Sequence, residues 1–277
     1  MIIKKRINDK NLFLSILIIY INIYMNKKII WITGASSGIG KALAVKFAEN
    51  GWKVAASARR ENLLNELRNI NQNIYPYPLD VTKIEKCIST AKSIIQEQGG
   101  IDICVFGTGM HDPKSEKRFN LDKIREIMEM NYFGTINSIN SVYDYFSEKK
   151  NGQLSIISSV AGYRGLPAAG AYCASKSALI SYTESLYFDL KRKNIKVSII
   201  CPGFIKTPMT DQNDFPMPML KSPEFAANKI YAGLIHKNNF EIHFPKSFTF
   251  LMKIIQILPN WLYFGAINLG NKYMKRD

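Results

Sequence analysis

The residues best suited to proton-transfer chemistry in this 277-residue chain are a serine, a tyrosine and a lysine. Tyr172 and Lys176 are four residues apart, and Ser159 stands thirteen residues before the tyrosine, at the end of an apolar run. On a helix, positions i and i+4 share one face with Cβ atoms ~5 to 6 Å apart, so the Lys176 ammonium can hold the phenol in a positive field. A free phenol has a pKa of ~10, and moving it near 7 requires ~4 kcal/mol of differential stabilisation. A lysine plus a second bound cation could supply that, so the pattern predicts a tyrosine that exchanges protons near neutral pH.

The tyrosine–lysine spacing alone is not specific. It recurs at Tyr24, Tyr145 and Tyr187, each followed by a lysine four residues later. The residues thirteen positions before those tyrosines are asparagine, tyrosine and alanine, and none is a hydroxyl at a strand end. Only Tyr172 has a serine in that position, which singles it out.

A glycine-rich turn near the start of the chain suggests the second reactant. The apolar run Ile29 to Thr33 reads as a buried strand, and Ala42 begins an apolar helical pattern. The intervening residues are Gly34, Ala35, Ser36, Ser37, Gly38, Ile39 and Gly40. Glycines let the backbone approach a pyrophosphate, and the helix N-terminus offers free N–H groups and the positive dipole end. The spacing differs from the common GxGxxG fingerprint, and a glycine turn without a ligand is the alternative. The distant serine, tyrosine and lysine favour a bound dinucleotide.

These segments resemble the short-chain dehydrogenase/reductase family from about Asn26 to about Phe244. The matching segments are Thr33–Gly40, Leu79–Thr82, Asn131 within Met130–Gly134, Ile157–Gly162, Tyr172–Lys176 and Cys201–Thr207. One segment departs from the pattern, because Phe106-Gly107-Thr108-Gly109 stands where the family usually has Asn-Asn-Ala-Gly. The asparagines that brace the sheet beside the cofactor are therefore missing. Thr108 and Gly109 remain expected contacts of the cofactor ribose.

The resemblance implies a catalytic set of Asn131, Ser159, Tyr172 and Lys176. Tyr172 would exchange a proton with a carbonyl oxygen while hydride passes between that carbon and the nicotinamide. Ser159 would hydrogen-bond the oxygen and orient it. Lys176 would contact the ribose and lower the tyrosine pKa. Asn131 would hold a water molecule that replaces the proton given up by Tyr172. Ordinary alternatives are a turn cap for Ser159, a mid-helix polar residue for Asn131 and a surface charge for Lys176.

The same resemblance implies a set of cofactor contacts spread over the whole domain. Asp80 and Val81 would meet the adenine, and the segment from Pro202 to Thr207 would fix the nicotinamide amide. The expected cofactor-binding residues are Gly34, Ser36, Ser37, Gly38, Ile39, Gly40, Arg59, Asp80, Val81, Thr108, Gly109, Asn131, Tyr172, Lys176, Pro202, Gly203, Ile205 and Thr207.

The choice of nucleotide depends on the end of the second predicted strand. An acidic residue there would accept hydrogen bonds from a ribose 2′-hydroxyl, and none is present. Arg59 can instead meet a 2′-phosphate, helped by Ser36. NADP(H) is therefore preferred, with NAD(H) as the other possibility. The alternative for Arg59 and Arg60 is a solvated helix entrance with Glu61 as partner.

Composition and pattern predict a single α/β domain with a doubly wound, Rossmann-type parallel sheet of about seven strands and helices on both faces. The dinucleotide-binding domain would span residues 25–245, followed by an apolar and basic extension at 246–277. The expected strands are Ile29 to Thr33, Val54 to Ser57, Ile74 to Leu79, Ile103 to Phe106, Leu154 to Ser158, Val197 to Cys201 and Glu241 to Phe244.

Charge and cysteine usage exclude some classes of function. The net charge of +15 is spread along the chain, which argues against nucleic-acid binding. The four cysteines and three histidines form no metal-ligand pattern. We therefore expect no metal, reduced core thiols and a cytoplasmic protein.

The two ends of the chain need separate interpretations. Residues 1–24 carry an apolar stretch but no Gly, Ala, Pro, Val or Thr, which favours translated upstream sequence with a true start at Met25 over a hydrophobic anchor. The stretch from Phe248 to Ile267 is apolar but interrupted by polar residues and proline, so a membrane span is improbable. It could cover the substrate site, pair with a second subunit or lie on a membrane surface. We favour packing within the chain or between subunits.

The predicted activity is carbonyl reduction or alcohol oxidation on a small hydrophobic substrate by a homodimer or homotetramer. The methionines and phenylalanine between Pro208 and Pro223 suit an apolar ligand. A dinucleotide-binding regulator on the same fold is the alternative. A serine hydrolase is disfavoured, because Ser159 lacks a GxSxG elbow.

Overall fold

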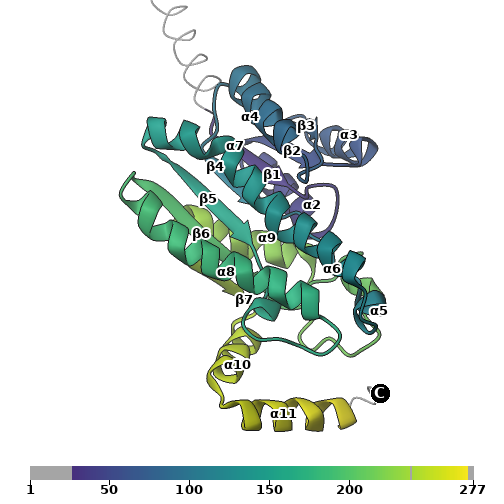
Figure 1. Ribbon diagram of the computed structural model, residues 1–277. Coiled ribbons are helices and arrows are strands. Elements are labelled where there is room, and N and C mark those ends of the chain that lie inside the picture. Colours follow the sequence, from purple (N-terminus) through teal and green to yellow (C-terminus); the bar gives the residue numbers. More distant parts are fainter. Residues whose placement is uncertain (1–26, 238, 274–277) are drawn as a thin grey trace, which may run out of the picture.

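The structure is a computed structural model, and it describes residues 27–237 and 239–273 (Figure 1). Its centre is a sheet of seven parallel strands in the order β3-β2-β1-β4-β5-β6-β7. The strands are β1 (Ile29–Thr33), β2 (Lys53–Ala58), β3 (Ile74–Pro78), β4 (Ile103–Phe106), β5 (Gly152–Ile157), β6 (Ile195–Pro202) and β7 (Glu241–Phe244). Each expected strand is present, and the predicted fold class is confirmed. The proposed start at Met25 lies outside the described residues.

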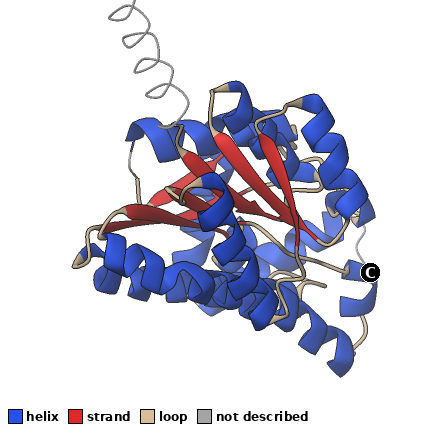
Figure 2. Ribbon diagram, turned by 90° about the horizontal axis from the view of Figure 1, so that it is seen from above, coloured by secondary structure: helices blue, strands red, loops and turns tan. Residues whose placement is uncertain are grey.

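Helices cover both faces of the sheet (Figure 2). One face packs against α2 (Gly38–Glu49), α3 (Glu61–Ile70) and α9 (Pro223–Ala232), and the other against α4 (Ile84–Gln98), α7 (Gly134–Lys149) and α8 (Gly170–Lys191). Side chains of β1 alternate between the two cores, with Ile30 and Ile32 on the α2 side and Trp31 on the α8 side. All five residues of β1 are buried, as expected for a central strand of a parallel sheet.

Further helices and turns complete the domain and extend it. They are α5 (Pro113–Glu116), α6 (Leu121–Met128), the π-helical turn η1 (Glu129–Phe133), the 3-10 turns η2 (Val160–Gly162) and η3 (Thr210–Gln212), the π-helical turn η4 (Gly233–Lys237), α10 (Lys246–Ile257) and α11 (Asn260–Tyr273). In Figure 1, α10 and α11 lie together at one end of the molecule, beyond β7. No helix within residues 27–237 and 239–273 is both long and apolar enough to cross a membrane.

The strand order reverses at β1, whose neighbours are β2 on one side and β4 on the other. In open parallel sheets this reversal opens a crevice at the carboxyl ends of the strands, where ligands bind. The glycine turn follows β1 directly, and Ser159 follows β5. The topology therefore brings the two distant motifs to the same edge of the sheet.

The four cysteines are buried and unpaired, as predicted for core thiols. Within the described part of the chain, no group of three or more His, Cys, Asp and Glu side chains could hold a metal ion.

Candidate active site

A cleft of about 450 Å³ runs along the carboxyl ends of the strands. One end of the cleft is lined by Arg59, Arg60 and Asp80, and the other by Ser159 and Tyr172. Every residue predicted to bind cofactor or to act in catalysis lines this cleft except Asn131. Residues separated by more than 100 positions in sequence are thus gathered along one elongated site.

The glycine turn lies tightly against the neighbouring loop. Gly34 has a φ of 74°, and a Cβ atom there would stand 2.8 Å from the carbonyl oxygen of Gly107. A Cβ on Gly40 would collide with the carbonyl oxygen of Gly34. No side chain caps the first turn of α2, and that turn contains no acidic residue. Its N–H groups and the positive end of its dipole are therefore available for an anion.

Basic side chains lie at the end of the cleft that is distant from Tyr172. The Arg60 guanidinium donates to Ser36 Oγ at 2.9 Å and to Ser37 Oγ at 3.2 Å. Arg60 is exposed, as in the alternative that we considered, but its hydrogen bonds reach the serines of the glycine turn. Burial would raise the pKa of Asp80, but hydrogen bonds from Thr82 and the positive charges of Arg59 and Lys83 lower it overall. Asp80 is accordingly held as an acceptor near the positive charges of Arg59 and Lys83.

Ser159, Tyr172 and Lys176 converge at the other end of the cleft. Ser159 Oγ accepts the Ala161 N–H at 3.1 Å and also hydrogen-bonds the Tyr172 phenol. Lys176 is 3% exposed, donates to the Ile157 carbonyl oxygen at 3.0 Å and places Nζ 5.7 Å from the centre of the Tyr172 ring. Lys176 is thus not a surface charge, and Ser159 caps a turn as well as facing the phenol.

The pKa of Tyr172 departs from the value we expected. Burial raises it to about 12, and the hydrogen bond to Ser159 only partly offsets that rise. Burial also lowers the pKa of Lys176 to about 8, because the ammonium has lost its hydration. Lys176 is not among the groups that lower the Tyr172 pKa in the protein without ligand, and a pKa lowered by Lys176 together with a second bound cation stays a prediction. The phenol is protonated at neutral pH.

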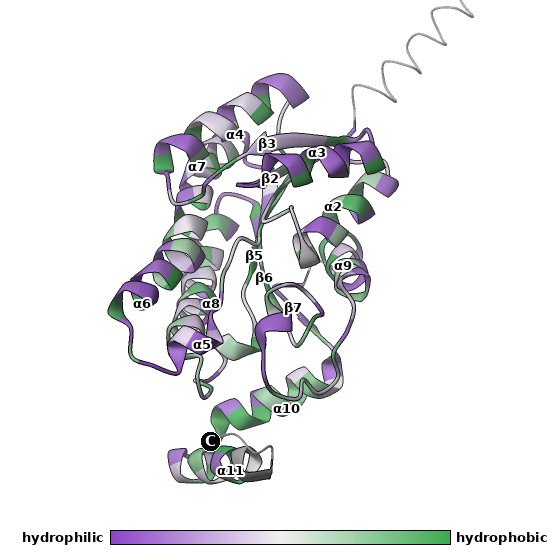
Figure 3. Ribbon diagram, turned by 90° about the vertical axis from the view of Figure 1, so that its right-hand side faces the viewer, coloured by the Kyte–Doolittle hydropathy of each residue, from purple (hydrophilic) through white to green (hydrophobic). Residues whose placement is uncertain are grey.

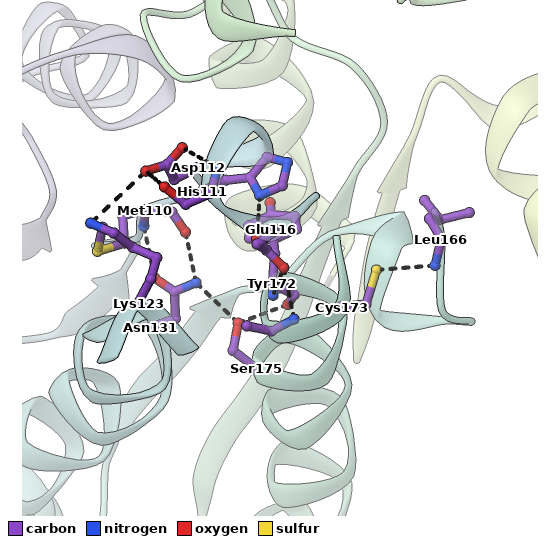
Figure 4. Close-up of polar contacts among 12 residues, drawn as sticks. Met110, His111, Asp112, Glu116, Lys123, Asn131, Leu166, Tyr172, Cys173 and Ser175 are labelled. Atoms are coloured by element: carbon purple, nitrogen blue, oxygen red, sulfur yellow. Dashed lines mark hydrogen bonds and ion pairs between the residues drawn. The ribbon is translucent and has the colours of Figure 1, made fainter. Parts of the chain in front are cut away.

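Asn131 braces the loop that lacks the usual asparagines. Its side chain is fully buried, accepts the Met110 N–H at 2.7 Å, and donates to the Met110 carbonyl at 2.9 Å and to Ser175 Oγ at 3.0 Å (Figure 4). Thr33 Oγ1 accepts the Gly107 N–H at 3.1 Å. The loop after β4 is therefore held by residues outside it. Both amide donors of Asn131 are engaged, and its water-binding role stays a prediction.

Two residues beside Tyr172 were not anticipated from the sequence. Glu116 is almost fully buried and accepts the first-turn N–H groups of α8 from Ala171 at 2.7 Å and Tyr172 at 3.2 Å. Its other oxygen contacts His111 Nδ1 at 2.9 Å, and the His111 ring lies 4.6 Å from that of Tyr172 (Figure 4). Ala169, at the N-cap of α8, offers no side-chain oxygen, so Glu116 supplies the cap from 55 residues away. No local sequence signal reveals that contact.

A second, mainly apolar pocket of about 260 Å³ adjoins the first. The two share Ser159, Tyr172, Gly203, Met209 and Thr210, so a ligand in the second pocket can reach the phenol. The segment after Pro208 contributes Phe215, as expected from its composition, whereas Met219 and Leu220 are exposed and do not line the pocket. The opposite wall comes from the C-terminal helices, which supply Phe248, Met252, Ala266, Ile267 and Gly270.

Arg164, five residues after Ser159, holds the C-terminal helices in place. Its guanidinium donates to the carbonyl oxygens of Ile255, Gln256 and Leu258 at the end of α10, and lies 4.0 Å from the Tyr263 ring of α11. The carbonyls at a helix C-terminus lack partners within the helix, and Arg164 satisfies them. The loop that carries the serine is thereby joined to the far wall of the pocket.

The sequence is similar to those of known dehydrogenases and reductases. A family model described as short chain dehydrogenase matches residues 28–216. The chain is 35% identical over 239 residues to an uncharacterized oxidoreductase of Myxococcus xanthus, a match that covers 85% of this chain and 94% of that protein. It is 33% identical over 189 residues to the 3-oxoacyl-(acyl-carrier-protein) reductase FabG of Thermotoga maritima, covering 67% of this chain and 77% of that protein.

Solved structures show the same architecture. The structure of ElxO with NADP bound superposes with a TM-score of 0.71 at 26% identity, covering 78% of this chain and 97% of that one. A short chain dehydrogenase from Burkholderia cenocepacia in complex with NADP has a TM-score of 0.75 at 22% identity, covering 87% and 97% of the two chains.

Proposed function

The chain belongs to the short-chain dehydrogenase family, and we propose that it is an NADP(H)-preferring oxidoreductase that reduces the carbonyl group of a hydrophobic substrate, or oxidises the corresponding alcohol. The observation that carries the proposal is the junction of two pockets at Tyr172, one elongated and rich in backbone donors, the other apolar. The test is consumption of NADPH by the purified protein with medium-chain aldehydes, acetoacetyl thioesters and steroid ketones.

The residues of the elongated cleft fit a dinucleotide. The glycine turn is packed so closely that a Cβ on Gly34 or Gly40 would meet backbone atoms, and the first turn of α2 offers uncapped N–H donors for the pyrophosphate. NADP(H) was bound in the related ElxO structure. Ser36, Arg59 and Arg60 would hold the 2′-phosphate, and Asp80 the adenine amino group. When bound, the nicotinamide supplies or accepts the hydride.

The protein's own residues would handle the proton. In reduction, Tyr172 donates its phenolic proton to the carbonyl oxygen as the hydride arrives at the carbonyl carbon, and Ser159 hydrogen-bonds the same oxygen and holds it in place. Lys176 donates one ammonium hydrogen bond to the Ile157 carbonyl oxygen, which leaves two N–H donors for ribose hydroxyls. Burial keeps the phenol protonated in the ligand-free protein, which is the form that donates the proton in reduction.

Removing the positive charge at the far end of the cleft should weaken NADPH binding selectively. Arg60→Ala is expected to raise the Kd for NADPH by about 10- to 100-fold, because a charge-assisted hydrogen bond contributes about 1.5–3 kcal/mol. The Kd for NADH, which lacks the 2′-phosphate, should change less than about threefold. Both constants can be measured by titration of protein fluorescence. Equal losses for the two nucleotides would contradict the assignment of a 2′-phosphate site to this arginine.

The pKa of Tyr172 should depend on the nucleotide that is bound. In the free protein the phenol should stay protonated up to about pH 10, because burial holds its pKa at about 12. NADP⁺ places a positive charge in the cleft, which favours the phenolate and should lower that pKa, whereas NADPH should not. Tyrosinate difference spectra of wild type and Tyr172→Phe measure the change. An identical titration with and without NADP⁺ would refute this electrostatic account.

A further inference from the structure

The outer surface of α10 and α11 is apolar to an extent not required for lining the pocket. In Figure 3 both helices lie at one end of the molecule, and each carries green, hydrophobic segments among more polar ones. Eight large apolar side chains there are 40 to 80% exposed, and we call them the outer apolar surface. They are Phe250, Leu251, Ile254, Ile257, Trp261, Leu262, Phe264 and Leu269. Such a concentration on two adjacent helices usually marks an interaction site.

The exposed side chains form a broad stripe on each helix. At 100° per residue, the four on α10 cover an arc of about 120° and the four on α11 an arc of about 160°. The only fully buried side chain described on α11 is Tyr263. The exposed apolar groups of α11 therefore occupy one broad side of the helix, opposite the buried Tyr263, which is the arrangement of an interfacial amphipathic helix.

The two helices are firmly held in the fold. Arg164 binds the α10–α11 junction, and the Tyr263 hydroxyl donates to the Gly165 carbonyl oxygen. Lys253 of α10 is ion-paired with Glu241 of β7. The inner sides of the same helices line the apolar pocket beside Tyr172. The outer apolar surface is therefore fixed next to the apolar pocket.

The charge of this segment identifies what it would bind. Residues 242–276 contain five Lys and Arg residues and no Asp or Glu. Pairing with a second copy through a twofold axis would bring two such positive segments together, and like charges across an interface disfavour association. An anionic membrane attracts them, and buried apolar area and electrostatic attraction together determine the binding of interfacial helices.

We propose that the outer apolar surface of α10 and α11 binds an anionic lipid bilayer and holds the apolar pocket against it. A lipid-dissolved carbonyl compound would then enter the pocket from the membrane. Membrane binding itself does not rest on the proposed turnover, and it can be measured without substrate.

Tryptophan fluorescence of the full chain tests the proposal directly. Trp31 and Trp52 are 0% and 8% exposed, whereas Trp261 is 73% exposed, and residues 1–26 contain no tryptophan. Vesicles of phosphatidylcholine with phosphatidylglycerol should shift the emission to shorter wavelength, and Trp261→Phe should abolish that shift. Vesicles of phosphatidylcholine alone should give a smaller shift.

A matched pair of variants separates this surface from hydrophobicity in general. Phe250→Ser combined with Phe264→Ser should weaken vesicle binding by about tenfold or more. Phe188→Ser, which removes a 63% exposed phenylalanine from α8, should leave it unchanged. NADPH binding by the wild type, the double variant and Phe188→Ser checks that all three proteins are folded.

Two results would overturn the proposal. One is the absence of any Trp261 shift at vesicle concentrations that saturate known interfacial helices. The other is a shift that grows with protein concentration without vesicles and is unaffected by lipid, which would assign this surface to a second copy of the chain.

Discussion

Replacing Tyr172 with phenylalanine is expected to lower kcat for NADPH-dependent carbonyl reduction by about 10²- to 10⁴-fold, the range that a positioned general acid contributes. The substitution removes one hydroxyl and keeps the ring, which lies 4.6 Å from the His111 ring and 5.7 Å from Lys176 Nζ. The dissociation constant for NADPH should therefore change little. Stopped-flow measurement of NADPH oxidation with a substrate that the wild type reduces gives kcat, and fluorescence titration gives the binding constant.

Tyr187→Phe provides a matched control elsewhere on the same helix. Tyr187 also has a lysine four residues later, and Lys191 Nζ lies 5.3 Å from its ring centre. This pair lines neither pocket, so turnover should be unaffected. If Tyr172→Phe retained wild-type turnover, or if both substitutions reduced it equally, Tyr172 would not be the proton donor.

Replacing Gly40 with alanine is expected to abolish dinucleotide binding and to destabilise the domain. The new methyl group would collide with the carbonyl oxygen of Gly34, a backbone atom that cannot move without displacing the whole turn. Overpacking of a well-packed site costs about 1–3 kcal/mol, and we expect a value at the upper end or beyond. The Kd for NADPH should rise by at least about 100-fold, which corresponds to about 2.7 kcal/mol. Urea denaturation and NADPH titration measure the two effects.

Gly265→Ala in α11 is the matched helical control. A Cβ there meets no atom within 4 Å, and alanine favours a helix interior by about 1 kcal/mol over glycine. This variant should be as stable as the wild type or slightly more stable, with unchanged NADPH binding. Tight NADPH binding by Gly40→Ala would show that the nucleotide does not lie against the glycine turn.

The fold and most of the cleft could be predicted from the sequence, because their signals are local. Each strand is a short apolar run, and three of the seven have the bounds that were expected, including β1 and β7. The glycine turn and the serine, tyrosine and lysine set are read from contiguous residues. The parallel topology then brings their elements to one edge of the sheet.

What the sequence could not reveal depends on contacts between distant segments. That Arg60 hydrogen-bonds Ser36, and is not simply paired with its neighbour Glu61, depends on how two loops meet across 24 residues. Glu116 caps a helix that begins 54 residues later, where the local N-cap is an alanine. The raised pKa of Tyr172 arises from burial, which an i to i+4 spacing does not report.

The role of the C-terminal extension was ambiguous from the sequence, because an apolar composition alone suits a pocket wall, a subunit interface or contact with a membrane surface. The structure separates its sides, since Phe248 and Met252 face the pocket while Phe250 and Ile254 are exposed. The anchoring by Arg164 joins main-chain carbonyls to a side chain about 90 residues earlier, and such a contact leaves no trace in the sequence.

The most direct test of the central claim is transfer of deuterium from NADPH labelled at the nicotinamide C4 position to a carbonyl substrate. With a substrate from the panel of aldehydes, thioesters and ketones, we predict an alcohol with one deuterium on the former carbonyl carbon, formed in a one-to-one ratio with NADP⁺. Tight NADPH binding without deuterated product from any of these substrate classes would contradict the account, and would favour a protein that binds the dinucleotide for regulation.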